Sequence, residues 1–215
     1  MIDKSFWKNR KVLITGHTGF KGSWLSLWLK FLGAKVYGIS LPPSTDPSLF
    51  KQLNLIDSFE ESHFIDIRNN LELKKKILKL SPEIVFHLAA QPLVLEGYKN
   101  PLMTWETNLM GSLNILNSLT NLKTKTAVVM VTTDKVYKNK EWNYGYREED
   151  ELGGYDPYSA SKAACEIAIS SWRSSYCGEE NNKENILRIA SARSGNVIGG
   201  GDWSKDRIVP DTVRA

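Results

Sequence analysis

Apolar positions along the chain form short runs that alternate with stretches of helical spacing. The first run, 11–15, is apolar and β-branched and predicts a buried strand. Residues 23–32 then show the apolar spacing of a helix, which Gly33 ends. Further runs that predict strands lie at 35–40, 63–65, 83–88, 126–131 and 185–189. The pattern therefore predicts six strands.

Helical patterns fill most of the intervals between these runs. Asn69 or Asn70 is expected to cap a helix that continues through Leu80. Other helices are expected at 101–119 and 157–176, a short helical turn near 49–53, and loops at 137–156 and 178–184. Because strands alternate with helices, we expect an α/β fold, a doubly wound parallel sheet with helices on both faces.

Sheets of this kind bind ligands at the carboxyl ends of their strands. The segments that follow the predicted strands should therefore converge on one cleft. These segments are 16–22, Asp66, 89–91, 132–137 and 188–196.

The segment 16–22, Gly-His-Thr-Gly-Phe-Lys-Gly, carries three glycines between a predicted strand and a predicted helix. Glycines at Gly16, Gly19 and Gly22 leave bare backbone at a helix N-terminus, where free N–H groups and the helix dipole favour an anion. In this strand–turn–helix setting the spacing predicts a dinucleotide pyrophosphate site. A tight turn without a ligand is the alternative.

Composition limits the other classes of function. The 215 residues are 41% hydrophobic and 24% charged, which suits one large α/β domain. The net charge of +4 comes from scattered lysines and arginines, so we expect no nucleic-acid partner. The apolar run 24–32 is too short to span a bilayer, and the first residues lack the apolar core of a signal peptide. A cytoplasmic protein without a membrane partner is expected.

The C-terminal residues suggest that the sequence is truncated. Residues 208–215 have the pattern of the first turns of a helix, without a stop signal. We therefore expect 1–215 to be a dinucleotide-binding domain, with a C-terminal substrate domain largely absent.

Cysteine and histidine give no sign of a disulfide or a metal. Cys165 and Cys177 lie twelve residues apart in one helical region, too far along a helix to bridge. His17, His63 and His87 have no metal-ligand spacing. We expect no metal.

Tyr158 and Lys162 lie four residues apart on one predicted helix and thus share a face. A cation beside a phenol favours the phenolate and lowers the phenol pKa toward the range of a general base. Such a base can remove a hydroxyl proton while a hydride leaves to a nicotinamide. An isolated pair arises easily by chance, but here it follows a dinucleotide loop.

These motifs together resemble the extended short-chain dehydrogenase/reductase family, which implies a Rossmann-like sheet. The shared motifs are the glycine loop, Asp66-Ile67, the segment 88–91 and Tyr158-x-x-x-Lys162. Narrower strings resemble the CDP-glucose 4,6-dehydratases within that family. They are 16–24 (GHTGFKGSW), 91–94 (QPLV), 133–137 (TDKVY), 140–142 (KEW), 153–159 (GGYDPYS) and 195–203 (GNVIGGGDW).

The resemblance implies a lyase that converts CDP-glucose to CDP-4-keto-6-deoxyglucose for deoxysugar and surface polysaccharide synthesis. The nicotinamide oxidises C4 with Tyr158 as base, water leaves across C5 and C6, and the hydride returns to C6. Asp134 would be the acid for water loss and Lys135 the base at C5, provided that Lys162 and the oxidised nicotinamide lower the Lys135 pKa. Thr133 would hydrogen-bond the C4 oxygen.

The resemblance also assigns binding residues. The cofactor set is Gly16, Thr18, Gly19, Phe20, Lys21, Gly22, Asp66, Ile67, Leu88, Ala89, Ala90, Gln91, Thr107, Thr132, Tyr158 and Lys162. Asp66 and Ile67 would approach the adenine, whereas Gln91 and Thr107 would line the nicotinamide half. Thr133 and Asn196 would contact the substrate, a nucleotide sugar. Arg188 could reach the cleft or lie on the surface, and a homodimer is expected.

The sequence departs from the usual NAD-binding pattern at one position that bears on the choice between NAD and NADP. NAD-specific proteins carry an acid after the second strand that bonds the ribose 2′-hydroxyl, and this chain has Ser40-Leu41-Pro42 there. No arginine stands at this point to bind a 2′-phosphate. NAD is therefore expected, and NADP stays open.

Two alternatives remain. A sugar-nucleotide 4-epimerase shares the fold, although the Thr133-Asp134-Lys135 string argues against it because an epimerase has no use for an extra acid and base. A non-catalytic NAD-binding module is the second alternative, since the expected substrate domain is missing.

Overall fold

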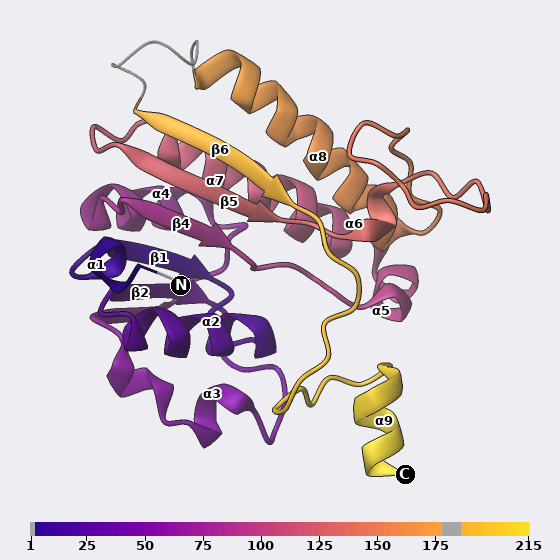
Figure 1. Ribbon diagram of the computed structural model, residues 1–215, viewed down its shortest axis with the longest axis horizontal. Coiled ribbons are helices and arrows are strands. Elements are labelled where there is room, and N and C mark those ends of the chain that lie inside the picture. The colour runs from indigo at the N-terminus through magenta and orange to yellow at the C-terminus, as the bar shows by residue number, and fades with distance from the viewer. Residues whose placement is uncertain (1–2, 178–185) are drawn as a thin grey trace.

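The computed structural model describes residues 3–177 and 186–215 and contains one parallel sheet of six strands. Its order is β3-β2-β1-β4-β5-β6, so the chain reverses direction across the sheet between β1 and β4 (Figure 1). The strands are β1 Lys11–Thr15, β2 Lys35–Ser40, β3 Glu61–Phe64, β4 Ile84–His87, β5 Thr126–Val131 and β6 Leu187–Ala192. This is the doubly wound arrangement that the alternating pattern predicts, and the fold class is confirmed.

Helices and short helical turns connect the strands. The α-helices are α1 Lys4–Trp7, α2 Phe20–Phe31, α3 Leu49–Gln52, α4 Asn70–Leu80, α5 Val94–Lys99, α6 Pro101–Trp105, α7 Gly111–Leu119, α8 Pro157–Tyr176 and α9 Ile208–Arg214. A π-helical turn, η2 Glu106–Met110, joins α6 to α7, and 3₁₀ turns form η1 Leu55–Ser58 and η3 Asp134–Val136.

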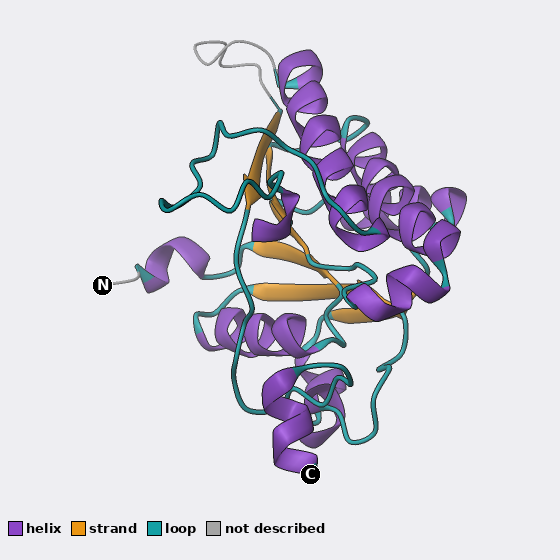
Figure 2. Ribbon diagram, turned by 90° about the vertical axis from the view of Figure 1, so that its right-hand side faces the viewer, coloured by secondary structure: helices purple, strands orange, loops and turns teal. Residues whose placement is uncertain are grey.

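Two apolar layers hold the helices to the sheet. Leu13 and Val85 project from one face into a core shared with α4, α7 and α8. Val12 and Ile14, on the opposite face of β1, pack against α2, α3 and η1. Successive strand residues point to opposite faces, so the continuous apolar run of β1 serves both layers. Figure 2 shows helices on both sides of the sheet.

Several boundaries agree with the sequence. β1, β2, β5 and α8 have the predicted limits, and α4 begins after Asn69, whose side chain accepts the Glu72 N–H as its N-cap. The helix predicted from 23 begins earlier, at Phe20, so the last part of the glycine motif is helical. β6 continues to Ala192, beyond the predicted 189.

The predicted helix 101–119 is divided by its π turn, and α1 and α5 were not predicted at all. Elements this short carry too few residues for a periodic signal. The predicted loop 178–184 and the first residue of the predicted strand 185–189 lie outside the described residues. Within the described ranges, no helix combines the length and apolar character needed to cross a membrane.

Candidate active site

The segments that follow β1 to β5 meet around one long cavity at the carboxyl edge of the sheet, whereas residues 194–196, which follow β6, line a second cavity instead. We call the first of these the long cavity. It is lined by every residue of the predicted cofactor set: Gly16, Thr18, Gly19, Phe20, Lys21, Gly22, Asp66, Ile67, Leu88, Ala89, Ala90, Gln91, Thr107, Thr132, Tyr158 and Lys162. Their individual roles stay predictions, but the structure does bring them together.

The glycine loop closes tightly under this cavity. Gly16 has φ +76°, and a Cβ there would lie 2.7 Å from the Ala89 nitrogen. A Cβ on Gly22 would lie 2.1 Å from the Gly16 carbonyl oxygen, which only glycine avoids. Gly19 is the N-cap of α2, and no side chain caps the first turn. The free amides of that turn therefore suit an anion.

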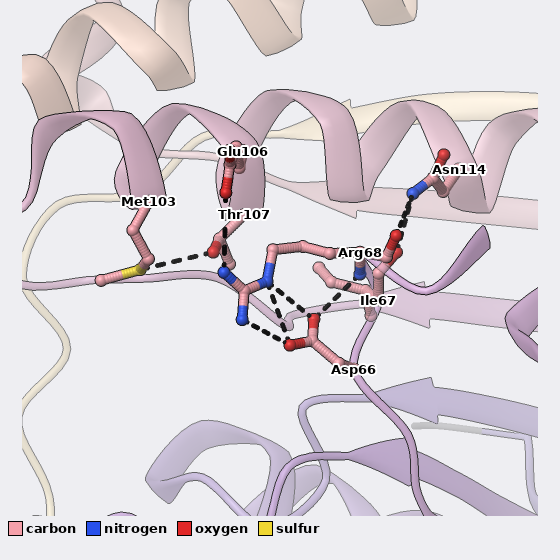
Figure 3. A network of polar contacts seen from close by, with 7 residues as sticks. All are labelled: Asp66, Ile67, Arg68, Met103, Glu106, Thr107 and Asn114. Carbon is pink, nitrogen blue, oxygen red and sulfur yellow. Dashed lines mark hydrogen bonds and ion pairs between the residues drawn. The ribbon is translucent and has the colours of Figure 1, made fainter.

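Asp66 and Arg68 form a fork on the β3 side of the long cavity (Figure 3). Arg68 donates from Nε to Asp66 Oδ2 at 3.0 Å and from Nη2 to the same oxygen at 2.6 Å, and its Nη1 lies 3.7 Å from Glu106 Oε2. The Arg68 hydrogen bonds outweigh burial and lower the Asp66 pKa. Asp66 is thus held as a carboxylate at the cavity wall.

The end of β2 presents hydroxyl groups in place of an acid. Ser40 Oγ lies 2.8 Å from Thr18 Oγ1, and Thr18 also donates to the Leu41 carbonyl at 2.8 Å. Both hydroxyl-bearing residues line the long cavity. A ribose would therefore meet neutral donors and acceptors here.

A buried amide that the sequence reasoning missed connects three segments of the site. Asn108, in the π turn, accepts the Gln91 N–H at 2.8 Å and donates to the Gln91 carbonyl at 3.1 Å and to Ser161 Oγ at 2.9 Å. The Gln91 side chain is held in turn by Leu93 and Thr104. A lone Asn in a helical pattern gives no signal of such a role, whereas π turns are frequent at functional sites.

Tyr158 and Lys162 project from α8 into the long cavity, and Tyr158 also lines a second cavity beside it. Burial raises the Tyr158 phenol pKa above its usual value, although the Thr133 hydroxyl and Arg207 oppose this shift. Lys162 is not among the main groups that oppose this rise, so its expected lowering of the phenol pKa stays a prediction. Burial also lowers the Lys162 pKa, and its Nζ donates to the Val131 carbonyl at 3.4 Å.

The second cavity, which we call the side cavity, holds four of the predicted substrate and catalytic residues. Thr133, Lys135 and Asn196 line it together with Tyr158. Lys135 Nζ donates to Asn196 Oδ1 at 3.2 Å and lies 3.4 Å from Asp134 Oδ1. These contacts of Lys135 are with an amide and a carboxylate, not with the cation on which the sequence hypothesis relied.

Two residues considered from the sequence lie elsewhere. Asp134 is exposed and lines neither cavity, although Thr133 donates to its Oδ1 at 3.1 Å. Arg188 is exposed in the middle of β6 and lines neither cavity.

His87 and both cysteines are buried. His87 is buried between Thr15 Oγ1 at 2.7 Å and Ser112 Oγ at 3.0 Å, and burial lowers its pKa to about 3. Cys165 and Cys177 are buried free thiols. Over residues 3–177 and 186–215 no group of three His, Cys, Asp or Glu side chains is arranged to hold a metal ion.

The sheet order, the glycine loop at the point where that order reverses, and the Tyr158/Lys162 pair define a Rossmann-like protein of the short-chain dehydrogenase/reductase type. More narrowly, the chain belongs to the GDP-mannose 4,6 dehydratase family, whose model matches residues 13–192.

Individual relatives agree with this assignment. The chain is 50% identical over its whole length to the CDP-glucose 4,6-dehydratase of Salmonella typhimurium, and it spans 60% of that protein. Among solved structures, it resembles the UDP-N-acetylglucosamine 4-epimerase of Methanobrevibacter ruminantium with a TM-score of 0.76 and 24% identity, covering 97% of this chain and 63% of that one. It also resembles the UDP-glucose 4-epimerase of Brucella ovis in complex with NAD, with a TM-score of 0.69 and 20% identity over 87% of this chain and 52% of that one. At these identities the structures show the fold alone.

Proposed function

We propose that this chain is the NAD-binding part of a dehydratase that converts CDP-D-glucose to CDP-4-dehydro-6-deoxy-D-glucose. The observation that carries the proposal is the position of Thr133 and Lys135 in the side cavity, next to the phenol of Tyr158. Elimination of water after C4 oxidation requires a further acid and base close to the residue that takes the C4 hydroxyl proton, and the Thr133–Lys135 turn would supply them. The 50% identity to a protein of that name supports the choice of CDP-glucose.

The long cavity fits a dinucleotide. The uncapped first turn of α2 would hold the pyrophosphate, while Ser40 and the Asp66 carboxylate would face the adenosine half. When bound, the nicotinamide accepts a hydride from the sugar C4 and later returns it to C6. The absence of a basic group at the end of β2 favours NAD over NADP.

In the proposed first step Tyr158 accepts the C4 hydroxyl proton. Its raised pKa disfavours the phenolate, so the Thr133 hydroxyl and the Arg207 cation are the groups of this chain that stabilise the anion. Lys162, buried next to it on α8, adds positive charge to the same wall of the long cavity.

In the proposed second step the Lys135 amine takes the C5 proton and the Asp134 carboxylic acid donates a proton to the departing C6 hydroxyl, so that one water leaves. The two groups lie 3.4 Å apart as an ion pair. The step leaves Lys135 as the ammonium and Asp134 as the carboxylate of this ion pair.

The test is incubation of the full-length protein, of which this chain would be the NAD-binding part, with CDP-glucose and NAD, followed by detection of the 4-keto chromophore in alkali. We expect the chromophore with the parent protein and none with Tyr158→Phe. Formation of the 4-epimer without the chromophore would support the epimerase alternative. NAD binding without either product would support a binding module, which is a real alternative because the chain spans 60% of its dehydratase relative.

Three further expectations belong to this proposal. Residues 1–215 would form the cofactor-binding domain, with most of a substrate domain contributed by additional sequence. The enzyme would act in the cytoplasm and would be a homodimer. The resemblance to the dehydratases supports all three, and each stays a prediction.

A further inference from the structure

A buried acid lies one helical turn beyond Lys162 and takes no part in the steps above. Glu166, on α8, has a side chain only 4% exposed and lines neither cavity. Its Oε1 accepts the Thr132 hydroxyl, and its Oε2 lies 3.0 Å from Arg193 Nη2. The carboxylate thus ties α8 to the residues that directly follow β5 and β6.

Arg193 extends this connection to the far end of the catalytic turn. Its Nη1 donates to the Tyr137 hydroxyl at 3.0 Å and to the Glu148 carbonyl at 2.8 Å. The guanidinium carbon also lies 5.0 Å from the centre of the Tyr137 ring, within cation–π range. One planar side chain therefore contacts α8, the residue after η3 and the loop before α8.

The two contacts enclose the segment that carries the proposed acid and base. Thr132, which Glu166 holds, precedes Thr133, Asp134 and Lys135. Tyr137, which Arg193 holds, follows them. Between these anchors the Asp134 N–H donates to the Ser194 carbonyl at 2.9 Å, so the side of the turn toward β6 is fixed as well.

We propose that Glu166 and Arg193 are positioning residues that hold the Thr133–Lys135 turn at the correct distance from Tyr158 and Lys162. This inference rests on the proposed function, since it concerns the same reaction. A buried ion pair is by itself weak support for stability. We propose a geometric role for the pair, because the planar Arg193 guanidinium fixes the direction of its hydrogen bonds as well as their length.

Electrostatics are consistent with a permanent pair. Burial alone would raise the Glu166 pKa, but hydrogen bonds from Arg193, Thr132 and Ser191 outweigh it and leave the pKa below its usual value. The carboxylate is therefore charged at neutral pH and accepts from both partners at once.

The proposal separates the two halves of the reaction. C4 oxidation depends on Tyr158 and Lys162, which α8 carries directly, and uses only the Thr133 hydroxyl of the turn, whereas Asp134 and Lys135 act in elimination alone. Elimination depends on the turn that Glu166 and Arg193 hold. Loosening the pair should therefore slow loss of the C5 proton much more than C4 oxidation, whereas simple unfolding would reduce both in proportion.

The experiment compares Arg193→Met with Arg188→Met, which changes an exposed arginine on β6, five residues before Arg193. For each variant, deuterium exchange at C5 and formation of reduced cofactor are measured with CDP-glucose. We expect Arg193→Met to lower the ratio of the first rate to the second on the order of ten- to a hundred-fold, because small misplacements of catalytic groups are costly. Arg188→Met should leave the ratio unchanged, and Arg193→Lys, which keeps the charge without the fork, should lie between.

A second measurement does not depend on turnover. Hydrogen exchange followed by mass spectrometry should show faster amide exchange over 132–148 in Arg193→Met and in Thr132→Val, with α8 unchanged. An unaltered rate ratio together with unaltered exchange in this segment would overturn the positioning role. A parent protein that gives no product contradicts the proposed function instead, and the exchange data still decide whether the pair holds the turn.

Discussion

At the scale of single residues, Lys135 is the most informative side chain of the proposed chemistry. Replacement by alanine removes the base at C5, so we expect deuterium exchange at C5 to fall at least about a hundred-fold, the usual range for loss of a general base. Reduced cofactor should still form, since Tyr158 is untouched. Lys138→Ala is the matched control, because Lys138 is exposed and pairs with Glu151 outside both cavities. Unimpaired exchange in Lys135→Ala would remove Lys135 from the mechanism.

The buried histidines predict how stability changes with pH. Burial lowers the pKa of His17 to about 4 and that of His87 to about 3, against 6.5 for the unfolded chain. The unfolded state therefore binds more protons below pH 6.5, so this contribution is complete above pH 6.5 and is lost as the pH falls through the folded values. With about 1.4 kcal/mol for each pKa unit, His17 accounts for roughly 3 kcal/mol and His87 for roughly 5 kcal/mol across that window.

Urea unfolding between pH 7 and pH 5 measures this slope above the range in which carboxylates titrate. His87→Gln should be less stable at pH 7 but show a shallower decline toward pH 5. A parental free energy of unfolding that does not fall over this interval would contradict the buried neutral state of both rings.

At the scale of elements, the glycine loop separates a folding requirement from a binding one. Gly22→Ala places a Cβ 2.1 Å from the Gly16 carbonyl, where backbone must move. We expect a loss of at least about 3 kcal/mol in unfolding free energy, in the range of severe steric substitutions. Gly19→Ala is the matched control, since its Cβ would meet only the Gly16 oxygen at 3.4 Å. It should fold normally, and an equal loss in both variants would contradict the steric argument.

The first turn of α8 depends on one cap. Asp156 Oδ1 accepts the Tyr158 N–H at 2.9 Å and the Ser159 N–H at 3.1 Å. Asp156→Ala should cost about 1 kcal/mol, a typical value for loss of an N-cap, in urea unfolding monitored by circular dichroism. Asp57→Ala, at an exposed aspartate in η1, should cost much less. Equal effects would show that the cap contributes nothing.

The elements that the sequence predicted well are those with a strong local signal. β1 has a continuous apolar run, β2 has Val36, Tyr37 and Ile39 within six residues that Gly33 precedes, and α8 has both a cap and a long helical stripe. The π turn at 106–110 has no such signal, because the apolar spacing around it is that of an ordinary helix. What distinguishes the turn is tertiary, namely the hydrogen bonds between Asn108 and the Gln91 backbone.

In the candidate site, too, some features follow from local sequence motifs and others depend on tertiary packing. Its cavity-lining residues follow from the rule that parallel strands present ligand sites at their carboxyl ends, together with family motifs. The Glu166–Arg193 pair and the contacts of Lys135 join residues that are 27 and 61 positions apart in the chain. Such pairings depend on packing between elements, and the spacing of residue types along one sequence does not report them.

At the scale of the whole molecule, cofactor binding should stabilise the fold. A ligand that binds the folded state alone adds about 2.7 kcal/mol at a hundred times its dissociation constant. We expect NAD to raise the melting temperature more than NADP at equal concentration, because the β2 end offers Ser40 and no cation. Ser40→Asp should widen the difference by adding an acceptor for the ribose 2′-hydroxyl. Equal shifts with both cofactors would contradict this account of the β2 end.

The π turn at 106–110 also separates what the core needs from what the site needs. A π turn holds one residue more than an α turn, so it is equivalent to a single-residue insertion into a regular helix. Deletion of one residue within 106–110 would restore the regular helix and keep Ile115 and Leu116 directed into the core, where both are fully buried. The same deletion would withdraw Asn108 from Gln91 and Ser161. We therefore expect the core to accept either length of this segment and the site to require the longer one.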